Sequence, residues 1–158
     1  MNKFIHAFFS VSLVTMSLAL LGCDMGSKEE TPKDSTPMAS SPKPMSAKLT
    51  GGSEVPAVVT DATGVAEATL TSGDVLTWKV TYSGLSGPVM GAHFHGPAIS
   101  GQNAAVVVPM TGSLASPISG SITLTPGQTT DLMSGKWYVN LHTAANPNGE
   151  IRGQLSPR

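Results

Sequence analysis

The stretch Val75-Leu-Thr-Trp-Lys-Val-Thr-Tyr82 decides the fold, because it alternates apolar and polar residues with a period of two. That period belongs to a β-strand, in which successive side chains point to opposite faces. We expect an inward face with Leu76, Trp78, Val80 and Tyr82, and an outward face with Thr77, Lys79 and Thr81. A strand of this kind indicates a sheet that packs one side on a hydrophobic core.

The same alternation returns on both sides of this strand. It predicts strands over residues 118–125, 137–142 and 150–155, and weaker ones over 46–50, 65–71, 89–95 and 104–108. Turns rich in Gly, Pro and Asn separate them, and residues 128–134 fit one short helical turn closed by Gly135. Eight or so short strands predict an all-β fold, a single antiparallel β-sandwich of Greek-key or flattened-barrel type. Trp78 and Trp137 are expected in its core.

The composition narrows the class further. Only 12% of the 158 residues are charged, whereas the chain holds 17 Gly and 12 Pro. This balance is unlike that of a helical bundle and is typical of short strands joined by turns. The formal net charge is −1 and no basic patch is visible, so a nucleic acid is not an expected partner.

The N-terminus has the parts of a secretory signal. Lys3 supplies a positive end, residues 4–21 are mostly apolar, and small residues follow. A transmembrane helix is the alternative, but the apolar run only just reaches the ~18 residues that a span needs. The motif Leu20-Leu21-Gly22-Cys23 resembles the bacterial lipobox, and Cys23 is the only cysteine in the chain. We therefore expect a signal peptide over residues 1–22 and a lipid, such as palmitate, on Cys23.

A linker is expected after the lipid anchor. Residues 23–45 contain Pro, Ser, Thr and mixed charge with almost no aliphatic side chain, so they cannot bury enough apolar surface to fold. We expect a disordered tether on the extracytoplasmic side of a membrane, in the cell envelope. Asp24 resembles a signal for retention in the inner membrane of some Gram-negative bacteria. Whether the inner or the outer membrane holds the anchor stays open.

Several motifs in order suggest a family for residues 46–156. They are GGSEVP at 51–56, YSGLSG at 82–87, AHFHGPA at 92–98, YVNLHT at 138–143 and NPNGEIRGQ at 146–154. This series resembles the CHRD domain, the module named after chordin, apart from a single Pro56 and from Phe94 where an aliphatic residue is usual. The resemblance implies a β-rich fold outside the cytoplasm. Chordin itself antagonises growth factors, and bacterial members look like exported proteins without an assigned activity, so no ligand is implied.

Three histidines form the one group in the domain that could bind a metal. His93 and His95 are two apart on an expected strand and share a face, and His142 projects outward from another strand. A His-x-His pair with a third His suits copper or zinc, and by analogy the pair resembles that of copper–zinc superoxide dismutases. Supporting polar residues on the same outer face are expected to be Glu150, Arg152, Asn140 and Tyr138.

A structural role for the histidines is the alternative. A hydrogen bond that His93 accepts from a backbone amide, or a pairing of His142 with Glu150, would tie strand ends together. Glu150 and Arg152 could form an ion pair with each other, or a cross-strand pair with Asp61 or Glu67.

The sequence contains none of the common enzyme motifs, so no catalytic residue is assigned. We expect a non-enzymatic binding or structural module that holds an envelope protein or a glycan. The alternative is a copper- or zinc-binding envelope protein that uses His93, His95 and His142, with redox activity like that of a superoxide dismutase as an extension. Association through sheet edges is a third hypothesis.

Overall fold

The computed structural model describes residues 41–158, which belong to one compact unit. The expected signal peptide, the lipidation site Cys23 and the linker as far as residue 40 lie outside the described residues. Between residues 41 and 158, no helix is both long enough and apolar enough to cross a membrane.

Nine strands and two short helices make up the described part of the chain. The strands are β1 (Lys43–Thr50), β2 (Thr63–Thr71), β3 (Val75–Ser83), β4 (Val89–His95), β5 (Val106–Pro109), β6 (Ile118–Thr123), β7 (Tyr138–Thr143), β8 (Ile151–Gln154) and β9 (Ser156–Pro157). The helices are the 3-10 helix η1 (Gly51–Ser53) and the α-helix α1 (Pro126–Met133). The strands pair antiparallel in the order β5-β4-β7-β8-β1-β2-β3-β6, and β9 pairs with β1.

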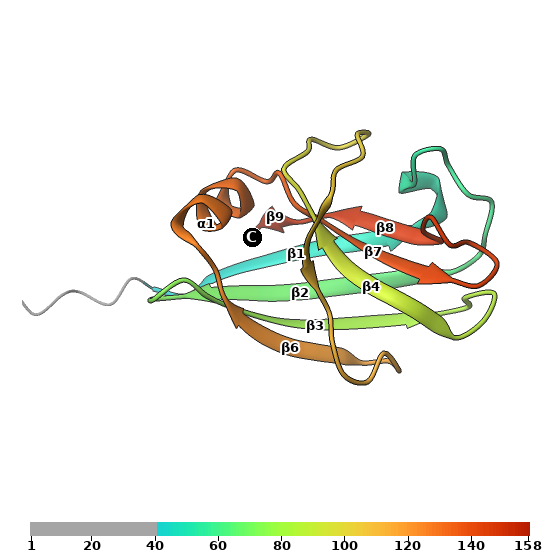
Figure 1. Cartoon of the computed structure of the whole chain (residues 1–158), viewed down its shortest axis with the longest axis horizontal. Coiled ribbons are helices and arrows are strands. Elements are labelled where there is room, and N and C mark those ends of the chain that lie inside the picture. Colours follow the sequence, from blue (N-terminus) through green and yellow to red (C-terminus); the bar gives the residue numbers. More distant parts are fainter. Residues whose placement is uncertain (1–40) are drawn as a thin grey trace, which may run out of the picture. The chain divides into compact units, whose positions relative to one another are not determined.

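The sheet curls so that its two halves enclose a hydrophobic core (Figure 1). Trp78 of β3 meets Phe94 of β4 with ring centroids 5.3 Å apart, although four strands separate β3 from β4 in the order of the sheet. Phe94 also contacts Trp137, with a centroid distance of 5.9 Å. The predicted all-β antiparallel fold is confirmed, in the form of one curled sheet that makes a half-barrel.

The alternation that predicted the strands also predicted the core. Leu76, Trp78 and Val80 of β3 are buried, as are Ile118 of β6 and both expected tryptophans. Ile122 departs from the expectation, because 39% of its surface is exposed. Strand β6 is the last in the sheet and pairs only with β3, so less of the molecule covers its far end.

Strand β1 begins earlier than expected. The predicted linker ran to residue 45, but the strand starts at Lys43, and Met45 pairs with Ala68 and is only 1% exposed. Residues 43–45 have the composition of a linker. They form a strand because they pair with β2 and because Met45 packs into the core. The described domain includes these three residues.

The helix also starts earlier than its predicted position at residues 128–134. Thr125 caps it in a capping box, since the Gln128 amide donates to Thr125 Oγ1 (3.3 Å) and the Thr125 amide donates to Gln128 Oε1 (2.9 Å). Pro126 occupies the first turn, where a missing N–H costs nothing. Gly135 follows the helix with a φ of 68°, as expected of a glycine that ends a helix.

Candidate metal centre

The structure brings His93, His95 and His142 together on the face of β4 and β7 that points away from the core. His93 and His95 alternate with Phe94, which is fully buried on the other side. Strand β7 is the neighbour of β4, and its His142 lies opposite Gly91, two residues before His93. One ligand nitrogen of each imidazole lies within 4.8 Å of the others.

The three rings surround a common point. Their centroids are 4.9 Å apart for His93 and His142, 5.6 Å for His93 and His95, and 6.0 Å for His95 and His142. A tetrahedral metal at about 2.0–2.1 Å from each nitrogen would place the nitrogens roughly 3.3 Å apart. The nitrogens lie within 4.8 Å of one another, so the rings would have to move closer together to bind one ion.

Hydrogen bonds fix the protonation of two of the rings. Nδ1 of His95 lies 3.0 Å from the carbonyl of Ala104, and Nδ1 of His142 lies 3.1 Å from the carbonyl of Pro147. A carbonyl only accepts, so each Nδ1 carries the proton and donates it. In a neutral ring, Nε2 then keeps a free lone pair, which is the arrangement that metal-binding histidines use. Nε2 of both rings, and Nδ1 of His93, are buried without a hydrogen-bond partner.

Burial keeps these imidazoles neutral at physiological pH. It lowers the pKa of His93, and the neighbouring His142 and His95 lower it further. Burial also lowers the pKa of His95, against the hydrogen bond to Ala104 that raises it, and it lowers the pKa of His142. Only a neutral imidazole coordinates a metal, so the group is poised for binding at pH 7.

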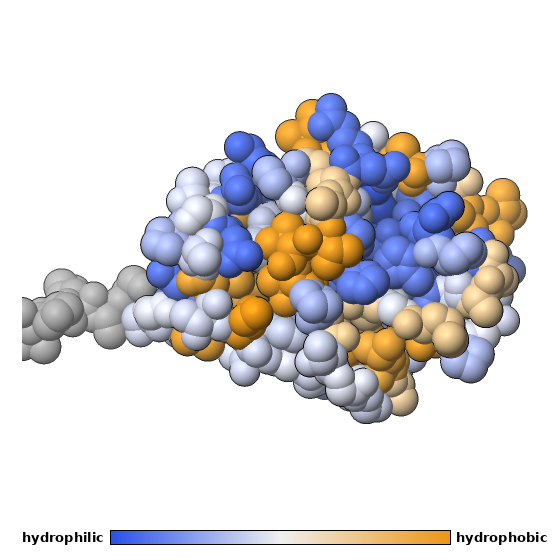
Figure 2. All heavy atoms as spheres, viewed as in Figure 1, coloured by the Kyte–Doolittle hydropathy of each residue, from blue (hydrophilic) through white to orange (hydrophobic). Residues whose placement is uncertain are grey.

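A shallow, largely apolar pocket opens onto the histidines. Its wall includes Met90 and Gly91 of β4, Val106 of β5, Thr143 at the end of β7, and Ala144 and Pro147 of the turn that follows. Figure 2 shows hydrophobic atoms beside a hydrophilic area on the face that carries β4 and β5. A Cβ at Gly91 would lie 3.0 Å from Cε1 of His93, so the absence of a side chain leaves room for that ring. The histidines are therefore accessible to a small ion from one side.

Arg152 and Tyr138 lie beside the site, as expected. Both were also expected to face solvent, but both are buried. Arg152 is 2% exposed, and its guanidinium donates to Asn103 Oδ1 (2.8 Å) and to the carbonyl of Gln102 (3.0 Å). The guanidinium lies 4.3 Å from the centre of the Tyr138 ring, which stacks on His95 at 4.9 Å. Residues 102–104 between β4 and β5 thus cover this part of the sheet and hold His95 in place.

Glu150 makes neither of the contacts expected of it. It is fully buried one residue before β8, and its carboxylate accepts hydrogen bonds from Ser86, Thr143 (2.6 Å) and Thr60 (3.1 Å) rather than from His142 or Arg152. Burial alone would raise the pKa of Glu150, but the hydrogen bonds from Ser86 and Thr143 lower it to about 2. The ion pair expected for Glu67 forms with Arg158 (3.0 Å), not with Arg152. Glu150 is therefore a structural anion that joins the loops at Thr60 and Ser86 to the end of β7.

Sequence reasoning assigned no role to Glu54, which is 7% exposed with Oε1 unpaired. Burial raises the pKa of Glu54 to about 7, although Arg152 and a hydrogen bond with Asn140 lower it. Asn140, expected to face outward, is also buried, and its Oδ1 has no partner. A Cβ at Gly149 would lie only 2.5–2.6 Å from both side chains, so this glycine lets the turn pass over them. No spacing in the sequence indicated this contact.

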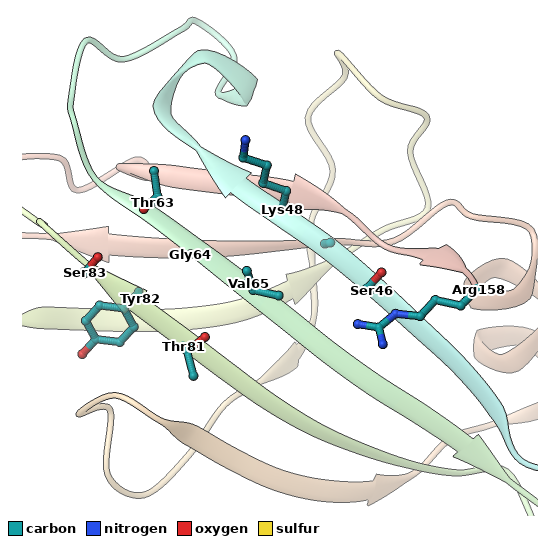
Figure 3. Close-up of a pocket in the computed structure, with 10 residues that line it drawn as sticks. Ser46, Lys48, Thr63, Gly64, Val65, Thr81, Tyr82, Ser83 and Arg158 are labelled. Atoms are coloured by element: carbon teal, nitrogen blue, oxygen red, sulfur yellow. The ribbon is translucent and has the colours of Figure 1, made fainter.

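A second concave surface lies on the outer face of β1, β2 and β3, far from the histidines in the order of the sheet (Figure 3). It is lined mainly by hydroxyl side chains with two cations, Lys48 and Arg158. Arg158 is already paired with Glu67, and no buried polar atom without a partner borders this groove within residues 41–158. The histidine pocket is therefore the better candidate site.

Comparison with known proteins assigns the family. The family model of the CHRD domain matches residues 45–155, which include β1 to β8 almost completely and all three histidines. Searches of curated proteins and of solved structures found no significant match. The match spans well over half of the chain and agrees with the motifs at residues 51–56, 92–98 and 146–154. The chain belongs to the CHRD domain family.

Proposed function

We propose that this protein is an exported, lipid-anchored protein of the cell envelope whose CHRD domain binds a copper or zinc ion through His93, His95 and His142. The family match supports a binding or structural module in general terms. The finer proposal rests on the histidine geometry and on the N-terminal motif of the sequence.

One observation carries the metal proposal. Two Nδ1–H groups, on His95 and His142, are held by backbone carbonyls, while the opposite nitrogens remain buried and unpaired near His93. A buried polar atom without a partner costs about 1–3 kcal/mol. A purely structural role explains the two hydrogen bonds. It leaves three buried nitrogens, one on each histidine, without a hydrogen-bond partner. Coordination of one ion by all three nitrogens would offset these costs together.

The test is an equilibrium titration of the full-length protein in detergent, purified without chelator and without affinity histidines. We expect one high-affinity site for copper or zinc per chain, lost in His95→Ala and in His142→Ala. Thr77→Ala, on the outer face of β3, serves as the matched control and should bind as the wild type does. A wild-type protein that takes up neither metal, or a variant that binds unchanged, contradicts the proposal.

The envelope part of the proposal has its own test. The motif at residues 20–23 and the tether-like composition that follows support lipidation of Cys23. Cells fed a labelled palmitate analogue should label the wild-type protein but not Cys23→Ala. The variant should leave the membrane fraction, since removing the acyl chains removes the hydrophobic anchor. Equal labelling of both proteins argues against the anchor.

A redox activity is the second candidate function. Three protein ligands leave one coordination position of a tetrahedral ion free, and the pocket beside the histidines opens to solvent. Superoxide dismutation by the copper-loaded protein would support this candidate, and a rate no higher than that of His95→Ala would remove it.

A further inference from the structure

Among residues 41–158, Met90 is the only sulfur-containing residue that borders the histidine pocket. It lies in β4 where the pairing with β7 shifts register between Val89 and Gly91, and its side chain is 69% exposed. It lines the same pocket as His93, His95 and His142. The other methionines of the described domain, Met45, Met110 and Met133, are buried or packed against the core. A thioether at this place selects for cuprous copper rather than zinc.

The charge around the site points the same way. The group that could hold an ion consists of imidazoles alone, with no thiolate or carboxylate among its members in the described chain. The buried guanidinium of Arg152 lies behind Tyr138, which stacks on His95. A fixed positive charge repels a divalent ion about twice as strongly as a monovalent one at the same distance. Three imidazoles bind either metal, so the fixed charge of Arg152, which reaches His95, adds a preference for Cu(I) over Zn(II) and Cu(II).

The pocket wall also favours the lower charge. Val106, Ala144 and Pro147 contribute apolar surface to the pocket beside the histidines. This apolar surface offers few hydrogen-bond partners to the water that hydrates a divalent ion, and it lowers the local dielectric constant. A monovalent ion gives up less hydration free energy than a divalent ion when it enters this environment.

We propose that the site is selective for Cu(I), with the Met90 thioether added to the three imidazole ligands. Met90 would then occupy the fourth position that the second candidate function, a redox activity, leaves open. This inference rests on the proposed metal site and names its metal and its fourth ligand. It makes Met90 the residue that determines which metal is bound. The histidines supply the affinity that copper and zinc share.

The test compares Cu(I) and Zn(II) binding to the full-length protein under anaerobic conditions, with a chromophoric Cu(I) chelator as competitor. Met90→Leu keeps the size of the side chain but removes the sulfur. Its affinity for Cu(I) should fall by at least about tenfold. Removing a residue that only supports the ligands already costs a metal site about that much, and Met90 is proposed as a ligand itself. Zinc binding by Met90→Leu should stay within about threefold of wild type. Met133→Leu, in α1, is the control and should change neither affinity.

X-ray absorption at the copper edge provides an independent measurement. The wild-type Cu(I) complex should show one sulfur scatterer, which disappears in Met90→Leu. Unchanged Cu(I) affinity of Met90→Leu, or tighter binding of zinc than of Cu(I) by the wild type, overturns the inference while the metal site stands. A wild type that binds neither metal overturns both the inference and the proposed function.

Discussion

At the scale of single residues, the domain holds two buried carboxyl groups with opposite titration behaviour. Glu150 accepts several hydrogen bonds, which hold its pKa near 2, whereas Glu54 has an unpaired oxygen and a pKa raised to about 7. The first is stabilising as an anion and the second as a neutral acid. The pH dependence of folding should separate these two roles.

Glu150→Gln should destabilise the domain at neutral pH by on the order of 2–3 kcal/mol, because the hydrogen-bonded anion is lost. The folded pKa lies below the unfolded value, so this contribution is complete above pH 4.5 and disappears as the pH falls towards 2. Urea unfolding between pH 2 and pH 7 measures it. A difference from wild type that does not shrink with falling pH would contradict the assignment. Glu67→Gln, at an exposed ion pair, is the control.

Glu54→Gln should have the opposite effect. The folded pKa of Glu54 is raised, so the stability that its neutral form gives is present below pH 4.5 and lost as the pH rises through 7. The amide stays neutral, and we expect the variant to exceed wild type by on the order of 1–3 kcal/mol at pH 8.5, with little difference at pH 4. Urea unfolding at the two pH values measures this. Lower stability of the variant at pH 8.5 would show that the buried group is an anion.

These residues also show where sequence reasoning ends. The spacing of His93 and His95 fixes their common face, because a strand alternates strictly. The contact of Glu54 with Asn140 depends on how the segment after β1 folds back over β7, and no local pattern encodes that. The partners of Arg152 come from residues 102 and 103, which are distant in the sequence.

At the scale of elements, periodicity located the strands but not their ends. The alternation at residues 75–82 is strong because β3 lies between β2 and β6 with one face on the core. Strand β1 was truncated in the prediction because Lys43 and Pro44 look like the preceding linker, and only the pairing with β2 reveals them as a strand. Boundaries that depend on a partner strand are not visible in one sequence.

Met45→Ala tests the earlier start of β1. Met45 is 1% exposed and belongs to the core cluster, so its truncation should lower the free energy of unfolding by about 2–5 kcal/mol. A methionine in a linker would give a change near zero. Chemical denaturation of the full-length protein distinguishes the two. In metal-free protein, where Met90 has no ligand role, Met90→Ala at this exposed methionine is the matched control and should cost much less.

At the scale of the whole molecule, the curled sheet gives the domain two different faces. The inner face encloses the core around Trp78, Phe94 and Trp137. The outer face of β4 and β7 carries the histidines, covered at its rim by residues 102–104 and by the turn after β7. The sequence predicts which residues share this face. It does not predict the covering loops, whose carbonyl groups at Ala104 and Pro147 hold His95 and His142 in place.

Metal binding should stabilise the whole domain, because the unfolded chain does not hold the three histidines together. At a free metal concentration 1,000 times the Kd, the free energy of unfolding should rise by about 4 kcal/mol. Thermal unfolding with and without copper or zinc measures the effect. His142→Ala should abolish the shift, whereas an equal shift in that variant would place the metal elsewhere.

The central claim is that three imidazoles of one CHRD domain hold a metal ion. Elemental analysis of the full-length protein, exposed to copper and zinc and then separated from free metal, tests it most directly. We predict about one equivalent of copper or zinc per chain in the wild type and almost none in His95→Ala. A well-folded wild-type protein without metal, or a variant with an equal metal content, would contradict the claim.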